Sequence, residues 1–417
     1  MKFDIISVIG LGYIGLPTAA MFASHGINVS GVDISSDAVE TINRGNAHIY
    51  EPGLEDLVKQ SVRNGKLKAI YVPEQADAFL ITVPTPFKLE EGKLEPDLSF
   101  IKAACKAIAP VLRKGNLIVL ESTSPVGTTE QLCAWLSRLR PDLIMPNTQS
   151  RTADVFVAYC PERVLPGKII NELIHNDRII GGITSKCSEA AVALYKLFVL
   201  ADCHMTNART AEMAKLTENA SRDVQIAFAN ELSMICDAAQ INVNELITLA
   251  NKHPRVNILT PGPGVGGHCI AVDPWFIVSE FPSISNLIAT ARKVNTEKEA
   301  WVFNSIQGRI EEIQSSRNNN EKVKLAIFGI AYKENINDFR ESPSLNIALK
   351  CQADSNLIVK IVEPHKTKLI DEEFDFVSVD HALSWADLNV ILVNHQQFEN
   401  MPFPKQKTIS YCQQRGN

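Results

Sequence analysis

The 417-residue sequence predicts an α/β protein in which two doubly wound domains are joined by a helical middle domain with a long central helix. Short β-rich runs alternate with segments of helical period from residue 4 to about 159 and again after residue 322, which is typical of parallel sheets. Between these parts, apolar residues keep a helical period over about 208–240 and 285–313. The expected domains are 1–200, 201–314 and 315–417.

Each element follows from local composition. Runs of apolar and β-branched residues bounded by Gly, Asn, Asp or Pro predict buried strands, whereas apolar residues three or four positions apart predict helices. The expected strands lie at 4–10, 28–33, 78–83, 116–122, 155–159, 178–183, 323–331, 356–364 and 387–395. Further helices are expected from about 187 to 199 and around 243–252. The stretch 315–322 has no apolar residue and is the expected linker.

Charge and composition narrow the class of function. The chain has 41 Lys and Arg against 47 Asp and Glu, with no long run of either sign, which argues against nucleic acid or an anionic membrane surface as the main partner. Because no apolar stretch reaches about 18 residues and no secretion signal is visible, we expect a cytoplasmic protein without a membrane partner. Nine cysteines without a CxxC pair predict neither disulfides nor a metal site.

A glycine-rich segment, GLGYIG, directly follows the first expected strand and opens a helix, and the second strand ends at Asp33. This is the dinucleotide-binding fingerprint in its required context, so the first domain is expected to be Rossmann-like. Asp33 would bind the adenosine ribose and repel a 2′-phosphate, which favours NAD over NADP and leaves flavin as an alternative. The expected cofactor residues of this segment are Gly10 for the tight turn, Gly12 for approach of the pyrophosphate, Tyr13, Ile14, Gly15 for close helix packing, and Asp33.

Two later loops carry hydroxyl groups where strands of the same sheet are expected to end. The first loop contains Thr85, and the second, at 121–129, contains Thr123. Ligands of open α/β sheets lie outside the carboxyl ends of the strands, so both threonines are candidates for contact with a cofactor or a substrate. Taken alone, each loop fits a simple Pro- and Thr-shaped turn slightly better.

A second glycine-rich run, 261–274, has four glycines within six residues, so its backbone must bend tightly or approach a ligand. Cys269 follows these glycines, and Asp273 lies four residues further on. A thiol in such a loop can act as a nucleophile when cations or helix amides stabilise the thiolate. We therefore interpret Cys269 as functional and the other eight cysteines as buried and inert. His268 is interpreted as structural, because adjacent side chains seldom point at each other.

The long central helix places three donors on one face. Lys215, Asn219 and Arg222 lie at positions i, i+4 and i+7. Such a stripe suits an oxyanion or a phosphate. A solvated helix face gives the same pattern more often, and the spacing alone favours that alternative.

The order of these motifs resembles that of the UDP-sugar 6-dehydrogenases, the family that includes UDP-glucose dehydrogenase. The resemblance covers about residue 4 to 400 and is most specific in the Cys loop together with the Lys helix. Its motifs are GLGYIGLP, PTPF, ESTSPVGT, YCPERVLPG, HPRVNI, GPGVGGHCIAVDPWF and AYKENINDFRESP. PERVLPG, HPRVNI and GGHCIAVDPWF are most similar to the branch that acts on 2-acetamido sugars. The tail at 407–417 matches the family poorly.

The resemblance implies roles for individual residues. The implied catalytic residues are Cys269 as the nucleophile, Lys215 and Asn219 as oxyanion donors, Asp273 to orient the lysine and a water, Glu162 for proton transfer in hydrolysis, and Thr123 to hold water near the nicotinamide. The implied substrate contacts are Arg163, Val164, Lys215, Asn219, Arg222, His253, Arg255, Gly266 and, around the UDP part, Tyr332, Lys333 and Arg340. Arg255 would act across a subunit interface, so a homodimer or larger homo-oligomer is expected.

The implied reaction is an oxidation of the sugar C6 alcohol to a carboxylic acid with two NAD per turnover. A nucleophilic cysteine is needed only when an aldehyde is oxidised further. UDP-N-acetyl-D-mannosamine is the expected substrate and UDP-N-acetylglucosamine the alternative, since Pro166 replaces a second acid found in UDP-glucose enzymes. A hydroxyacid dehydrogenase with one oxidation, or an NAD-binding regulatory protein, would produce one or no NADH per substrate molecule instead of two.

Overall fold

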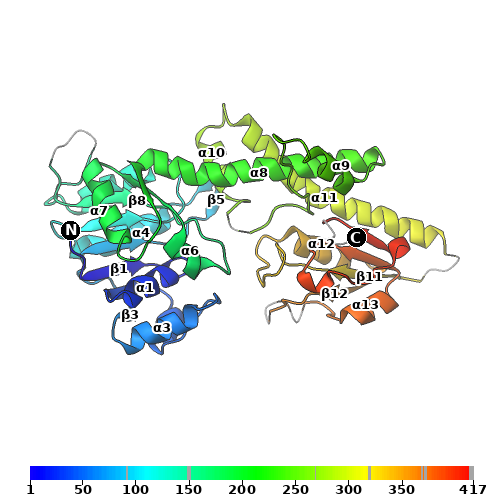
Figure 1. The fold of residues 1–417 in the computed structure, drawn as a ribbon, viewed down its shortest axis with the longest axis horizontal. Helices are drawn as coiled ribbons and strands as arrows, with labels where there is room; N and C mark the ends of the chain where they lie inside the picture. Colours follow the sequence, from blue (N-terminus) through cyan, green and yellow to red (C-terminus); the bar gives the residue numbers. More distant parts are fainter. Residues whose placement is uncertain are drawn as a thin grey trace. The chain divides into compact units, whose positions relative to one another are not determined.

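The computed structural model describes residues 1–90, 93–147, 152–267, 269–317, 321–367, 370 and 373–412. The chain forms two compact units, Met1–Thr217 and Glu218–Asn417, called unit 1 and unit 2 below. Their boundary falls within the long helix α8 (Ala208–Ala238), drawn in green in Figure 1. Each unit contains its own largely parallel sheet with helices around it, which confirms the predicted α/β fold class. His268 and residues 318–320 of the expected linker lie outside the described residues.

The sheet of unit 1 has eight strands. In spatial order they are β10 (Cys203–Asn207), β9 (Arg178–Gly182), β8 (Phe156–Tyr159), β7 (Leu117–Leu120), β4 (Ala78–Ile81), β1 (Ile5–Ile9), β2 (Asn28–Val32) and β3 (Leu67–Ile70). A separate antiparallel hairpin consists of β5 (Phe87–Glu90) and β6 (Lys93–Pro96). In the sheet, β8 and β9 run antiparallel, and the other neighbours are parallel.

The reversal at β9 differs from the expected all-parallel sheet. The chain leaves β8 and enters β9 at the same end of the sheet, so this connection does not have to cross over the sheet as a connection between parallel strands does. Tyr159, at the end of β8, pairs with Gly181, close to the end of β9. The beginning of β9, with Arg178, therefore lies beyond the carboxyl end of β8. This places a charged residue at the edge where cofactors of such sheets bind.

Both faces of this sheet are buried, as a doubly wound fold requires. Side chains alternate along β7, so Leu117 and Val119 pack in one core, and Ile118 and Leu120 in the other. The helices are α1 (Gly15–Ser24), α2 (Ser36–Asn43), α3 (Leu54–Arg63), α4 (Ser99–Ile108), α5 (Thr128–Leu139), α6 (Ile169–His175) and α7 (Ser185–Tyr195). Residues of α1, α3, α6 and α7 join the first core, and residues of α4 and α5 join the second.

Two strands of this sheet were missed by the sequence analysis, and both are edge strands. The exposed side of an edge strand carries polar residues, so the apolar signal is weak. In β3 (Leu67–Ile70) only alternate side chains are fully buried, and β10 (Cys203–Asn207) has no fully buried side chain. The sheet thus takes in residues that the sequence analysis had grouped with the helical segment.

Unit 2 combines helices with a four-stranded parallel sheet. Its sheet order is β12 (Leu357–Val362), β11 (Val323–Phe328), β13 (Leu388–Ile391) and β14 (Thr408–Ser410). Its helices are the second part of α8, α9 (Val243–Ala250), α10 (Asp273–Glu280), α11 (Asn286–Ser315), α12 (Pro343–Gln352) and α13 (Val379–Trp385). Leu325 and Ile327 face a core shared with α11 and α12, whereas Ala326 and Phe328 face α13. In the described ranges, no helix is both long and apolar enough to span a bilayer.

Candidate active site

The fingerprint loop has the geometry of a phosphate-binding turn. Gly10 adopts a φ of +95°, which a residue with a side chain rarely takes. A Cβ on Gly15 would come within 1.8 Å of the carbonyl oxygen of Gly10, so this position requires glycine. A Cβ on Gly12 would meet nothing within 4 Å, and no side chain caps the first turn of α1. The helix N-terminus therefore faces open space suited to a pyrophosphate, and these residues fit a dinucleotide.

Asp33 closes the other side of this turn. Its Oδ2 accepts the Leu11 N–H at 2.8 Å, and its Oδ1 accepts the Ser35 N–H at 2.9 Å. The carboxylate thus stands at the carboxyl end of β2, tied to the fingerprint loop. In this position it can accept hydrogen bonds from a ribose while holding the loop in place.

The two hydroxyl-bearing loops lie together at the same edge of the sheet. Thr85 Oγ1 donates to the Thr123 carbonyl at 2.6 Å. Ser122 Oγ donates to the Val83 carbonyl at 2.6 Å. Thr82 Oγ1 donates to the Gly10 carbonyl at 2.7 Å and so links this loop pair to the fingerprint turn. The sequence-predicted cofactor residues of unit 1 are therefore neighbours at one edge.

A buried charged cluster lies next to these loops. Glu162 Oε2 forms an ion pair with Arg178 Nη1 at 2.7 Å, and both side chains are nearly inaccessible to solvent. Glu162 Oε1 accepts the Arg163 N–H at 2.7 Å, so both oxygens of this carboxylate have donors. Tyr195 donates its hydroxyl to Glu121 Oε1 at 2.5 Å, and its ring lies 5.0 Å from the Arg178 guanidinium. We call Glu121, Glu162, Arg178 and Tyr195 the acid cluster.

Within the acid cluster, the two carboxyl groups have different environments. Burial raises the pKa of Glu121 to about 7, and the charge of Glu162 adds to the rise. The Arg178 charge and the Tyr195 hydroxyl act in the opposite direction on the same pKa. Glu121 Oε2 is buried and has no hydrogen-bond partner in the described part of the chain. Two neighbouring acids whose environments differ in this way are typical of sites of proton chemistry.

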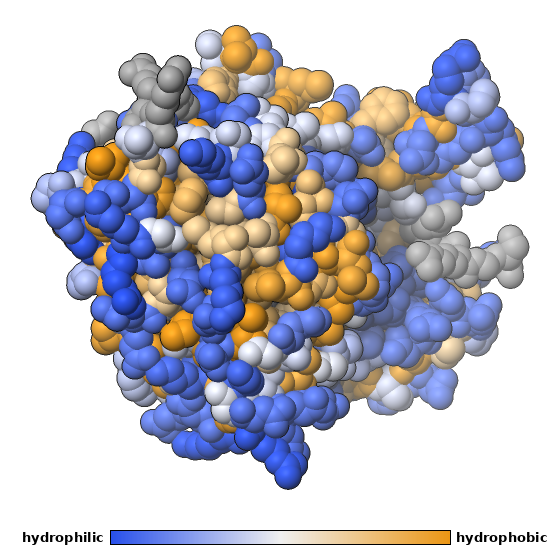
Figure 2. All heavy atoms as spheres, turned by 60° about the vertical axis from the view of Figure 1, so that its left-hand side comes forward, coloured by the Kyte–Doolittle hydropathy of each residue, from blue (hydrophilic) through white to orange (hydrophobic). Residues whose placement is uncertain are grey.

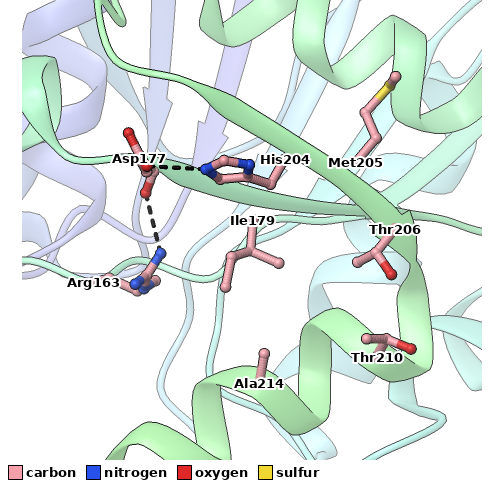
Figure 3. A pocket seen from close by; sticks show the side chains of 8 residues that line it. All are labelled: Arg163, Asp177, Ile179, His204, Met205, Thr206, Thr210 and Ala214. Carbon is pink, nitrogen blue, oxygen red and sulfur yellow. Dashed lines mark hydrogen bonds and ion pairs between the residues drawn. The ribbon is translucent and has the colours of Figure 1, made fainter.

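A pocket of about 390 Å³ opens at the outer edge of the sheet, where β9 and β10 meet the start of α8 (Figure 3). His204 Nε2 pairs with Asp177 Oδ2 at 2.9 Å, and Arg163 Nη1 donates to the Asp177 carbonyl at 3.2 Å. Its lining consists of Arg163, Asp177, Ile179, His204, Met205, Thr206, Thr210 and Ala214. Of the predicted substrate residues of unit 1, Arg163 reaches this pocket. Val164 instead packs beside the first core.

Helix α8 carries the predicted oxyanion donors. Lys215 is buried, with 9% of its surface exposed, and Asn219 follows one turn later and is half-buried. Asn219 Nδ2 donates to Asp273 Oδ2 at 2.5 Å. Asp273 is itself 3% exposed at the first residue of α10. Within unit 2, Asn219 and Asp273 are therefore hydrogen-bonded neighbours, whereas the role implied for Asp273, orienting Lys215 and a water, stays a prediction.

The Cys269 loop leads directly into α10. The Cys269 carbonyl accepts the N–H groups of Val272 at 3.1 Å and Asp273 at 2.8 Å, which forms a tight turn. The Cys269 side chain is exposed. Six of the other cysteines are buried and two are half-buried, and burial raises the pKa of the Cys105, Cys160, Cys351 and Cys412 thiols to about 12. Cys269 is thus more exposed than the other cysteines, and its role as the nucleophile stays a prediction.

The glycines before Cys269 pack against the predicted UDP-binding segment. The Gly267 N–H donates to the Arg340 carbonyl at 3.2 Å. A Cβ on Gly266 would come within 2.5 Å of the Glu341 carbonyl oxygen and 2.8 Å of the Tyr332 Cβ. Gly267 has a φ of +79° and lies against the Tyr332 ring. The substrate residues Gly266, Tyr332 and Arg340 are therefore neighbours within unit 2.

A buried pair, Glu363 and His395, holds the loop that bears Tyr332 and Lys333. Glu363 Oε2 accepts the Ile330 N–H at 2.8 Å. His395 Nδ1 accepts the Asn335 N–H at 2.9 Å, so the ring proton must lie on Nε2, which is 3.1 Å from Glu363 Oε2. Burial acts to raise the pKa of Glu363, but the hydrogen bonds that its carboxylate accepts from His395 and from the Ile330 and His365 N–H groups outweigh burial and lower this pKa. This pair fixes the loop, while the Lys333 side chain is exposed.

Three other predicted substrate residues are exposed. Arg222, His253 and Arg255 lie on the surface of unit 2. The Arg255 N–H donates to His253 Nδ1 at 3.3 Å, which places these two residues in one turn after α9. Arg222 is on α8. Their predicted roles stay predictions.

Sequence reasoning missed Arg178 and Tyr195, and it quoted Glu121 only as the first residue of a loop. Arg178 could have indicated the acid cluster from the sequence, because a charged residue at the start of an otherwise apolar strand must find a partner when it is buried. Its partner, Glu162, follows a different strand and could not be identified from spacing.

Comparison with known proteins adds the family context. Residues 4–199, 209–297 and 326–413 match, in this order, the NAD binding domain, the central domain and the UDP binding domain of the UDP-glucose/GDP-mannose dehydrogenase family. A UDP-N-acetyl-D-mannosamine dehydrogenase from Yersinia pestis is 55% identical over 403 residues, which cover 96% of this chain and 95% of that protein.

Two further relatives are informative. An NDP-N-acetyl-D-galactosaminuronic acid dehydrogenase from Ralstonia nicotianae is also 55% identical, over 418 residues that cover 100% of this chain and 96% of that protein. Among solved structures, the UDP-D-ManNAc dehydrogenase from Pyrococcus horikoshii has a TM-score of 0.85 and 37% identity, covering 97% of this chain and 93% of that one.

Proposed function

Because the chain belongs to the UDP-glucose/GDP-mannose dehydrogenase family, we propose that it oxidises the C6 alcohol of UDP-N-acetyl-D-mannosamine to the carboxylic acid. NAD is the cofactor and, when bound, accepts one hydride in each of two oxidations. One observation carries the proposal. The Asp273 carboxylate accepts a hydrogen bond from the Asn219 side chain, and the Asp273 N–H donates to the Cys269 carbonyl, so the expected oxyanion donor is linked to the loop that bears the thiol.

In the first oxidation, Lys215 acts as the base. It takes the proton of the C6 hydroxyl, directly or through a water, while the hydride leaves the same carbon. The product is an aldehyde. Simple alcohol oxidation would end here and would leave Cys269 without a role.

In the second oxidation, the Cys269 thiolate adds to the aldehyde carbon and a C–S bond forms. The aldehyde oxygen becomes an oxyanion, which Lys215 and Asn219 hold. Loss of the second hydride converts the adduct into a thioester. Water then attacks this thioester, the C–S bond breaks, and the acid and the thiolate are released. Asp273, Glu162 and Thr123 are the residues that we assign to aligning this water.

The acetamido group of the sugar is the better supported part of the substrate assignment. Two relatives that are 55% identical to this chain have names that refer to N-acetylated sugars of different configuration. We therefore keep the galacto-configured sugar as a second candidate beside UDP-N-acetylglucosamine. A site that hydrogen-bonds the amide should reject UDP-glucose by up to about 10⁴-fold, because buried polar groups would be left unpaired.

The test is an assay of NADH formation with purified protein, NAD and a panel of UDP-sugars. The panel contains UDP-glucose and the manno, gluco and galacto forms of the UDP-N-acetyl sugars. The highest kcat/KM on UDP-N-acetyl-D-mannosamine, with two NADH per sugar, is expected. Equal or higher efficiency on UDP-glucose would overturn the substrate, and one NADH per sugar would indicate a single-oxidation dehydrogenase.

We also propose that the protein is a homodimer that uses the exposed face of α8 in unit 2. Phe228 and Ile235 lie seven residues apart on this face and are each 56% exposed. Unit 1 offers a different apolar area, which Figure 2 shows among hydrophilic residues. Phe228→Asp should give monomers in light-scattering measurements, whereas Leu200→Asp, at a 75% exposed position of unit 1, is the matched control. A dimeric Phe228→Asp protein would contradict this interface.

A further inference from the structure

Two backbone groups of the Cys269 loop are tied to one group of buried polar side chains in unit 2. At the start of the loop, the Gly262 N–H donates to Asn230 Oδ1 at 2.9 Å. Directly after Cys269, the Ile270 carbonyl accepts from Arg292 Nη1 at 3.3 Å. The loop therefore has a fixed point on each side of the thiol.

The two fixed points are connected through side chains of α8 and α11. Asn230 Nδ2 donates to Asn295 Oδ1 at 2.9 Å. Asn295 Nδ2 donates to Asp223 Oδ1 at 2.8 Å, and that oxygen lies 3.3 Å from Arg292 Nη1. We call Asp223, Asn230, Arg292 and Asn295 the anchor cluster. None of its members is more than 3% exposed.

Stability alone is a poor explanation for the anchor cluster. Burial raises the pKa of Asp223 to about 6 and lowers the pKa of Arg292, so the charged forms of both groups are disfavoured in this environment. Buried ion pairs of this kind are often no more stabilising than apolar side chains of the same volume. The cluster instead fixes the position of the Cys269 loop. Its hydrogen bonds hold both ends of a loop that has four glycines in 262–267 and would otherwise be free to adopt many conformations.

We propose that Asp223, Asn230, Arg292 and Asn295 are positioning residues for Cys269, an inference that rests on the proposed role of Cys269 as the nucleophile. Attack on an aldehyde requires the thiolate at a defined distance and angle from the carbonyl carbon. Arg292 fixes the carbonyl of Ile270, the residue directly after the cysteine, and Asn230 fixes the Gly262 N–H before it. The first oxidation does not use the thiol, so the anchor cluster matters for the second oxidation and not for the first.

This separation of the two oxidations defines the experiment. Arg292→Lys keeps the charge but replaces the planar guanidinium, whose Nη1 contacts both Asp223 and the Ile270 carbonyl, with a shorter ammonium group of different geometry. Asn230→Ala removes the acceptor of the Gly262 N–H. In both variants we expect the second oxidation to slow on the order of 10²-fold while the first keeps its rate. NADH per sugar should fall from two toward one, and the aldehyde should be trapped by added hydroxylamine.

Ser233→Ala is the matched control. Ser233 is buried on α8 one turn after Asn230; its Oγ accepts from Lys298 Nζ at 2.8 Å and donates to the Asn230 carbonyl at 2.6 Å. Among the described residues of the Cys269 loop, it has no hydrogen-bond partner. It should keep two NADH per sugar. Arg292→Lys and Asn230→Ala proteins that keep two NADH per sugar, or that slow both oxidations equally, would overturn the inference.

A substrate-independent measurement separates this inference from the proposed function. If wild-type protein forms no NADH from the sugar panel, or if Cys269→Ala forms two, the proposed function fails. Iodoacetamide alkylation of Cys269, followed by mass spectrometry, still reports the position of the thiol. If Cys269 is alkylated at a different rate in Arg292→Lys and Asn230→Ala than in wild type and Ser233→Ala, the result supports the positioning role of the anchor cluster. Identical rates in all four proteins contradict it.

Discussion

Replacing Glu121 with Gln removes a buried carboxyl group whose protonation should govern the stability of unit 1 near neutral pH. Burial raises the pKa of Glu121 from 4.5 to about 7 in the folded protein. Between these two values the folded protein keeps the proton and the unfolded chain releases it, so folding becomes less favourable as the pH rises. The penalty is complete above the folded-state value and absent below the unfolded-state value.

The size of the effect follows from the same two values. One pKa unit corresponds to about 1.4 kcal/mol, so the full penalty on the free energy of unfolding is about 3 kcal/mol. Gln cannot ionise and avoids this penalty, but its amide group lies where Glu121 Oε2 has no partner in the described residues. An unmet buried donor costs about 1 to 3 kcal/mol at every pH. Relative to wild type, Glu121→Gln should therefore gain about 2.5 kcal/mol between pH 5 and pH 8.

Urea unfolding of both proteins at pH 5, 6, 7 and 8 measures this difference, with equal m-values as the condition for comparing midpoints. Tyr195→Phe is a control of opposite sign. It removes a donor that stabilises the Glu121 carboxylate, so it should lose more stability at pH 8 than at pH 5. A difference between wild type and Glu121→Gln that stays constant from pH 5 to pH 8 would refute the reasoning.

Three further predictions concern the cofactor, the thiol and a buried amine. Asp33→Ser should raise KM for NAD and lower the NAD-to-NADP ratio of kcat/KM, and wild-type protein that uses both equally would contradict this. Cys269→Ala should stop after one oxidation, measured as NADH per sugar, whereas Cys236→Ala, at a buried position, should still give two. Lys298→Met should stabilise the protein at pH 6, because burial lowers the pKa of Lys298 to about 7. Since that penalty on wild type fades as the pH rises, urea midpoints should show the advantage shrinking by about 4 kcal/mol from pH 6 to pH 10; a constant advantage would count against it.

The fingerprint loop could be predicted because its requirements belong to the backbone. Gly10 needs a positive φ and Gly15 needs the space of a hydrogen, and both demands appear directly as glycines in the sequence. Asp33 could be recognised because it stands at the end of the second expected strand, where a dinucleotide-binding fold carries an acidic residue. The long helices and the central strands could be predicted for a similar reason, since each carries its own apolar period.

The acid cluster and the anchor cluster could not be predicted in this way. Arg178 lies beside Glu162 because β9 runs antiparallel to β8, and no local sequence pattern predicts that direction. Asp223 and Arg292 are ordinary polar residues on two helices until α8 and α11 bury them against each other. In both cases the chemical environment depends on which elements become neighbours, and that depends on the whole fold.

The position of Arg178 has a consequence for sequence variation in this protein. One guanidinium balances two carboxyl groups and lies against the rings of Tyr195 and Phe198. Loss of the arginine alone would leave two acids in an apolar space, and loss of Glu162 alone would remove the ion-pair partner of a buried cation. Substitutions here are therefore strongly non-additive. A combinatorial library at these positions should yield folded proteins with the whole charged set or with none of it, and few with half.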